Sequence, residues 1–395
     1  MSGLGRLTPT SSRLFAHATA GQFIFGLVLA LPGTLFGTPA WTTSVGCDVA
    51  AQANLLVVFF TGQLTCTAAA GIAVDHFGAQ RVLTAGTGLL ALGFLALAAA
   101  AGPGAAAMGF ALLAAGGSTI NAASNTLVSV TFGERRGAML SLLGVFCAIG
   151  ACLAPFAVGV TGITSRLTAL GALAVVVTVA PLAMDRAAWT SRGVTLRAML
   201  ALGRDHRLAG LILWLGVEFG VEAILAGWSA AYALATLPGV NAAFVVVLYW
   251  AGLCAGRVSA PWALRRSSKL VTVGVAAGLA AFAVAGMVSA STWSALAVSV
   301  FAAGFALGPL APTIVAVAGD RYPQQSGLAI GALLSVAQIG AVLLPWIAGR
   351  VAISQGFRAA MLVPLAAAIA LSLSAGALRV GRALRTVEPT RSEPA

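Results

Sequence analysis

The sequence predicts an all-α membrane protein whose twelve transmembrane helices form two pseudo-symmetric six-helix bundles. Three observations predict this fold: a very apolar composition, twelve apolar stretches of membrane-spanning length, and a repeat that relates the two halves of the chain. Of the 395 residues, 59% are hydrophobic and only 8% are charged, and the mean hydropathy is +0.99. Such a composition is typical of a protein with many membrane spans.

Each of the twelve stretches is about 18 to 28 residues long, enough to cross a bilayer as a helix. A polar segment at residues 185–207 separates the first six stretches from the last six. This segment is either an amphipathic surface helix or a plain linker. The predicted organisation is an N-terminal bundle at 1–184, a cytoplasmic loop at 185–207, a C-terminal bundle at 208–378 and a cytoplasmic tail at 379–395. The stretches lie at residues 14–36, 54–74, 82–101, 105–131, 138–160, 167–184, 208–232, 242–262, 270–288, 293–317, 328–348 and 359–378.

The basic residues predict the orientation, because short cytoplasmic loops collect lysine and arginine. With the N-terminus inside, only Arg166, Arg350 and Arg358 of the 22 basic residues fall in outer segments. We therefore expect a multi-pass protein of the cell's inner (plasma) membrane with both termini cytoplasmic. The net charge of +12 is then a topology signal and does not indicate nucleic acid as a partner.

A half-length repeat becomes visible when the sequence is shifted by 190 positions. The shift places the fifth stretch on the eleventh, so that Pro155 falls on Pro345 and Gly150 on Gly340. These are equivalent stretches of two six-span halves. Parallel repeats of this kind are a secondary-transporter architecture, with the substrate site near the midplane between the halves.

A charged turn joins the second and third stretches, in the segment GIAVDHFGAQRVL at residues 71–83. Gly71, Asp75, Gly78 and Arg81 stand at the spacing of the G-x-x-x-D-x-x-G gating motif, so the segment resembles that of the major facilitator superfamily. Glycines permit a tight turn and close helix approach, and the charges can form ion pairs or cap a helix end. Alone, the segment can equally be an ordinary turn with cytoplasmic charges. With the spans and the repeat, the resemblance implies a major facilitator fold and alternating access.

Three further segments resemble the fucose-permease-like sugar transporters within that superfamily. They are GVEFGVEAILAGWSAAY in the seventh stretch, NAASNTLVSVTFGERRGAMLSLLGVFCAIGACLAP across the fourth and fifth, and GDRYPQQSGLAIGALL with LLPWIAGRV across the tenth and eleventh. The resemblance implies proton-coupled uptake of a small neutral polar solute such as a sugar. The chain departs from the subgroup in having no histidine near Gly144.

Polar side chains within the stretches are candidate substrate-binding residues, because a polar group in hydrocarbon needs a partner. Amides suit neutral hydroxylated ligands, and aromatic rings offer flat apolar faces. The alternatives are interhelical hydrogen bonds for the amides and packing or an interfacial belt for the aromatics. The candidates are Gln22, Gln63, Asn121, Asn125 and Gln338 among the amides, and Trp214, Trp228, Tyr232, Trp250 and Trp346 among the aromatics.

Two acidic residues, Glu218 and Glu222, lie one helical turn apart in the seventh stretch. No basic residue falls clearly within the core of a stretch, and Arg257 comes nearest to doing so. Two carboxylates this close in a partly dry site cannot both stay ionised. We therefore expect the pair to carry the coupling proton. The alternative is a permanently protonated glutamate that only hydrogen-bonds a neighbouring helix.

The sequence leaves two other functions open. GACLAPFAVG in the fifth stretch loosely resembles the Gly-Pro motif of drug-efflux antiporters, which favours proton-driven efflux, and a non-transporting membrane receptor is the second alternative. The sequence contains no Walker loop, metal-ligand cluster or nucleophile elbow, so we expect no enzyme, no cofactor and no metal site. The expected partners are a small-molecule substrate, protons or another coupling ion, and the lipid bilayer, with the protein acting as a monomer.

Overall fold

The computed structural model describes residues 9–132, 136–159, 162–179, 205–322 and 326–387. Most of the predicted central loop and the end of the tail therefore lie outside the described residues. Ten helices of the described part are long and apolar enough to cross a membrane, and two shorter apolar helices cover 142–158 and 163–179. The twelve-span prediction is thus confirmed.

The N-terminal half contains six spanning helices and one short surface helix. The short helix, α2, follows α1 and was not predicted, because seven residues give no clear periodic signal in so apolar a chain. Thr38 precedes it and Pro39 opens it, a position where the missing N–H of proline is harmless. The helices are α1 (Pro9–Phe36), α2 (Pro39–Val45), α3 (Val49–Phe77), α4 (Ala79–Ala98), α5 (Pro103–Phe132), α6 (Arg136–Val158) and α7 (Ile163–Val179).

The C-terminal half repeats this arrangement, with two departures from the predicted stretches. The tenth span is broken into two helices at Gly308 and Pro309, because proline cannot donate the helical hydrogen bond. The last helix continues past residue 378 to Val387. The helices are α9 (His206–Thr236), α10 (Ala242–Arg266), α11 (Lys269–Ser289), α12 (Trp293–Leu307), α13 (Leu310–Arg321), α14 (Ser326–Gln355), α15 (Phe357–Ala360) and α16 (Leu362–Val387).

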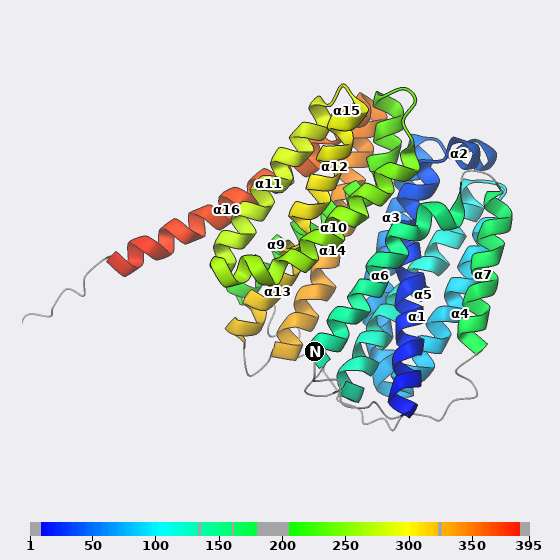
Figure 1. Ribbon diagram of the computed structural model, residues 1–395, viewed down its shortest axis with the longest axis horizontal. Coiled ribbons are helices and arrows are strands. Elements are labelled where there is room, and N and C mark those ends of the chain that lie inside the picture. Colours follow the sequence, from blue (N-terminus) through cyan, green and yellow to red (C-terminus); the bar gives the residue numbers. More distant parts are fainter. Residues whose placement is uncertain (1–8, 133–135, 160–161, 180–204, 323–325, 388–395) are drawn as a thin grey trace, which may run out of the picture.

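The two halves lie side by side, and α16 projects away from the C-terminal half (Figure 1). Within the N-terminal half, α1 packs on α6, α3 on α5 and α4 on α7; within the C-terminal half, α9 packs on α14, α10 on α12 and α11 on α16. Between the halves, α3 packs on α14 and α10 on α6. A pseudo-twofold axis that exchanges the halves maps each of these contacts onto its counterpart.

The closest helix crossings follow the same symmetry. A Cβ atom on Gly150 of α6 would lie 2.0 Å from the carbonyl oxygen of Phe23, and one on Gly26 of α1 would lie 1.9 Å from that of Cys147. In the other half, a Cβ on Gly340 would lie 1.8 Å from the carbonyl oxygen of Gly216. The shift of 190 positions takes Gly26 to Gly216 and Gly150 to Gly340. The sequence repeat therefore preserves backbone-to-backbone packing of paired helices.

Outside the spans, polar contacts tie α13 to the starts of two neighbouring helices. The Tyr322 hydroxyl donates to Asp205 Oδ2 at 2.6 Å, and Lys269 forms an ion pair with Asp320. The hydrogen bond from Tyr322 lowers the pKa of Asp205 below its usual value, because it stabilises the carboxylate form. These contacts fasten the end of α13 to the first turns of α9 and α11.

Candidate functional site

A cavity of about 260 Å³ lies between the two halves. Helices α1, α3, α5 and α6 form one wall, and α9, α10 and α14 form the other. Such a position between repeats is where transporters of this architecture bind their solutes. The polar residues of the first wall are Gln22, Gln63, Thr67, Ser118, Asn121 and Asn125, and those of the second are Glu222, Trp250, Arg257 and Gln338.

The cavity is closed at the end of the molecule that carries α2 and α15, called here the α2 end. A Cβ on Gly33 of α1 would lie 2.2 Å from the carbonyl oxygen of Ala226 in α9, and one on Gly37 would lie 2.7 Å from Cβ of Ala230. The opposite end, where α1, α9 and α14 begin, is called the terminal end. Asn121 lines the cavity and is nevertheless exposed. Solvent therefore enters from the terminal end.

Three amides on the first wall form a connected group. Gln22 Nε2 donates to Asn121 Oδ1 at 3.1 Å, and Asn125 Nδ2 donates to the same oxygen at 2.8 Å. The contact between Gln22 and Asn121 joins α1 to α5, so the interhelical role considered for these residues exists alongside their place on the cavity wall. Each amide retains further donors or acceptors that can face a ligand.

An ion pair stands on the second wall. Arg257 Nη2 lies 3.5 Å from Glu222 Oε2, and the two side chains are 41% and 19% exposed. The hydroxyl of Tyr249 donates to the backbone oxygen of Glu222 at 3.3 Å. The distance between the two charged groups is long and both are partly solvated, so each can still bind a ligand.

In the sequence, Arg257 is the basic residue that comes nearest to the core of a stretch, and no role was predicted for it. The helix in fact continues to Arg266, which places Arg257 well inside it. One signal was present: Trp250 and Arg257 are seven residues apart and therefore share a helix face. Both line the cavity.

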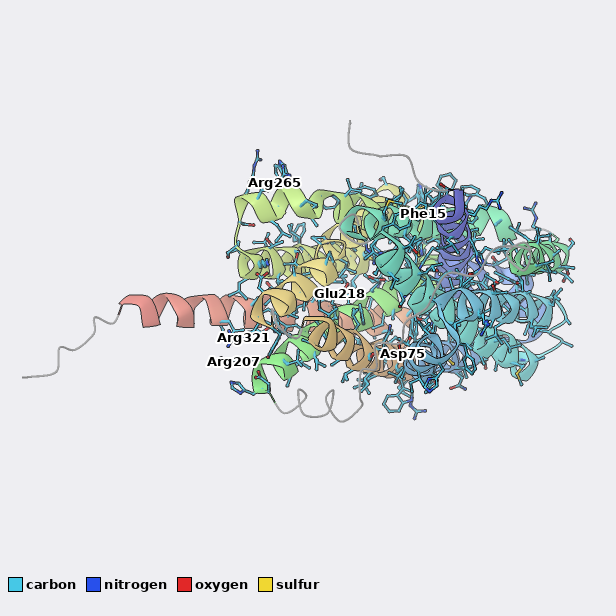
Figure 2. The ribbon with its side chains drawn as sticks, turned by 90° about the horizontal axis from the view of Figure 1, so that it is seen from below. Phe15, Asp75, Arg207, Glu218, Arg265 and Arg321 are labelled. Atoms are coloured by element: carbon cyan, nitrogen blue, oxygen red, sulfur yellow. The ribbon has the colours of Figure 1, made fainter. Side chains whose placement is uncertain are left out.

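Glu218 lies one turn from Glu222, near where the two halves meet (Figure 2). It is only 1% exposed and does not line the cavity. Neither of its carboxyl oxygens has a hydrogen-bond partner of acceptable geometry among the described residues. A buried carboxylate without a partner is costly, and the neutral form is much less so.

Of the predicted aromatic residues, Trp250 lines the cavity, and Trp214, Trp228 and Tyr232 do not. Trp228 is fully buried and makes an edge-on contact with Phe357, with ring centroids 5.8 Å apart. The Tyr232 hydroxyl donates to the backbone oxygen of Met287 at 2.7 Å, and Trp214 is buried elsewhere. All three have the packing positions that were the alternative reading of the aromatic residues.

The gating-motif residues lie at the terminal end, between α3 and α4. Gly78 has φ +84°, a left-handed conformation that favours glycine, and it links the two helices directly. A Cβ on Gly71 would meet open space, and Arg81 is exposed. Asp75 also lies at this end of the N-terminal half (Figure 2). None of the four motif residues lines the cavity, although Thr67, one turn before Gly71, does.

No protein-family model matches the sequence, and no curated protein sequence matches it. A mutant of the nucleoside transporter NupG superposes with a TM-score of 0.79 at 14% identity, covering 92% of this chain and 99% of that chain. The chain has the major facilitator fold. A mutant of the Escherichia coli fucose:proton symporter FucP gives a TM-score of 0.64 at 17% identity, covering 93% of this chain and 98% of that one. FucP in the outward conformation gives 0.63 at 18% identity, covering 92% and 98%. At these identities, the superpositions show the fold alone.

Proposed function

We propose that this protein is a secondary active transporter that works by alternating access and takes up a small neutral polar solute together with a proton. The observation that carries the proposal is the cavity between the two halves, with hydrogen-bonding amides on one wall and a balanced charge pair on the other. Amides suit hydroxyl groups, and an ion pair leaves little net charge to attract an ionic solute. A sugar is the leading candidate, in line with the named substrate of FucP, and a nucleoside is supported by that of NupG.

We assign the coupling proton to Glu218, with Glu222 as its charged neighbour. Glu218 is buried without a hydrogen-bond partner of good geometry, which favours its protonated form. Glu222 instead forms an ion pair with Arg257. The two carboxyl groups thus have different environments, as expected where one carries a proton and the other contacts a solute.

We further propose that the terminal end faces the cytoplasm, so that the described structure is open inward. Arginine in the terminal segments supports this orientation. Residues 185–207 would then join the two bundles as a cytoplasmic loop, and the gating motif would act at the cytoplasmic face as the halves rock.

Uptake into proteoliposomes tests the proposal. Labelled fucose and labelled uridine are supplied outside, with and without an inward proton gradient. We expect gradient-dependent accumulation of at least one of them, abolished by a protonophore. Gradient-driven movement of a lipophilic cation in the opposite sense would instead indicate an efflux antiporter. Absence of any flux, with solute binding intact, would indicate a receptor.

A further inference from the structure

Two buried N–H groups on the cavity wall have no acceptor among the described residues. They are the indole Nε1 of Trp250, whose residue is 3% exposed, and the amide Nε2 of Gln63, whose residue is 5% exposed. Both residues line the cavity, Gln63 from the N-terminal half and Trp250 from the C-terminal half. A buried donor without an acceptor is costly, so a position that keeps one needs a reason.

Neighbouring contacts hold the Gln63 backbone and the Trp250 ring in place. Ser118 of α5 donates to the backbone oxygen of Gln63 at 3.1 Å, which fixes this part of α3 against α5. The ring of Trp250 packs edge-on against that of Tyr249, with centroids 5.6 Å apart. Tyr249 in turn donates to the backbone of Glu222. The indole N–H of Trp250 is thus positioned by a ring contact that does not satisfy it.

Trp250 also lies deep in the cavity. Helix α10 starts at the α2 end, so Trp250 lies farther toward that closed end than Arg257. Ala226 lines the same cavity, and its carbonyl oxygen makes the close approach to Gly33 that seals it. A solute that reached this depth would touch both halves next to the seal.

We propose that Trp250 and Gln63 form a ligand subsite across the cavity, with one residue on each wall and Trp250 on the side of the closed end. The inference rests on the proposed function and adds a requirement for the solute. An indole N–H can only donate, so the solute presents an acceptor oxygen to Trp250, as a hydroxyl, a ring oxygen or a carbonyl. Gln63 binds a second polar group, because an amide can donate or accept. A lipophilic cation without oxygen cannot satisfy this subsite.

Variants that remove the polar atoms and keep the shape test the proposal. Trp250→Phe and Gln63→Met remove the donors, and Trp228→Phe is the matched control. The indole Nε1 of Trp228 is also buried without an acceptor, but Trp228 lies outside the cavity. Affinity is measured as the solute-induced rise in melting temperature and as the KM of exchange, with fucose and uridine as probes.

We expect Trp250→Phe and Gln63→Met each to weaken binding about three- to tenfold, the usual contribution of one hydrogen bond. Neither should melt earlier than the parent protein without solute, because no internal hydrogen bond is lost. Trp228→Phe should leave affinity unchanged.

Three results would overturn the subsite. The first is unchanged affinity in both cavity variants while the parent protein still accumulates solute, which leaves the proposed function standing. The second is a large loss of melting temperature in Trp250→Phe without solute, which would reveal an internal partner. The third is failure of the parent protein to bind either probe, which would remove the proposed function as well.

Discussion

At the scale of single residues, Glu218 and Glu222 lie in different environments, one buried without a partner and one in an ion pair. If Glu218 carries the coupling proton, Glu218→Gln keeps its size and removes its titration. We expect gradient-driven accumulation to be lost, while exchange of solute between the two sides continues, because exchange needs no change of protonation. Parallel accumulation and exchange assays in proteoliposomes measure both quantities. Full accumulation by this variant would contradict the assignment.

The ion pair of Glu222 and Arg257 leads to a second prediction at this scale. Removing one partner leaves an unpaired charge in a partly dry site, which costs about 3–5 kcal/mol for fully buried pairs. Since Arg257 is 41% exposed, we expect about 1–2 kcal/mol for Glu222→Gln or Arg257→Gln. The double variant should recover at least half of that loss, as measured by thermal unfolding in detergent. Strictly additive losses would show that the two charges do not depend on each other.

At the scale of helices, the close crossing of α1 and α6 depends on a missing side chain. A Cβ on Gly150 would lie 2.0 Å from the Phe23 carbonyl oxygen, so Gly150→Ala forces the helices apart. We expect a loss of about 1–3 kcal/mol or more in the free energy of unfolding. Gly144→Ala on the same helix is the control, because a Cβ there has no neighbouring atom within 4 Å. If both variants melted alike, backbone contact would not hold this crossing together.

Much of the fold could be predicted from the sequence at this scale, because span length and apolar composition are properties of each stretch alone. The break at Pro309 and the short helix α2 were not predicted. The break lies inside one continuous apolar stretch, and α2 is too short to be recognised as a stretch of its own. The site was harder to predict. Helix α9 is buried on most of its surface, so its apolar pattern could not show that Glu222 faces the cavity while Trp228 and Tyr232 face other helices.

At the scale of the whole molecule, contact of the halves at the α2 end keeps the cavity closed there. Gly37→Trp would place a large ring where a Cβ would already meet Ala230. We expect the α2 end to be held open. Cys147, which lines the cavity, should then react with a membrane-impermeant thiol reagent added from the α2 side. Gly104→Trp is the control, because a Cβ there meets open space. Unchanged labelling in Gly37→Trp would show that Gly37 lies outside the seal.

The balance of charges around the cavity has an electrical consequence. Glu222 and Arg257 cancel, so with Glu218 protonated the group is neutral, and without the proton it carries one negative charge. The protein loaded with solute and proton would therefore change conformation without moving charge across the membrane. Only the return of the empty protein would respond to the membrane potential, which would change its free energy by up to about 2.3 kcal/mol per 100 mV. We expect an inside-negative potassium diffusion potential, set with valinomycin at equal pH, to accelerate net uptake and to leave solute exchange unchanged. A voltage effect of equal size on exchange would place the moving charge on the loaded protein instead.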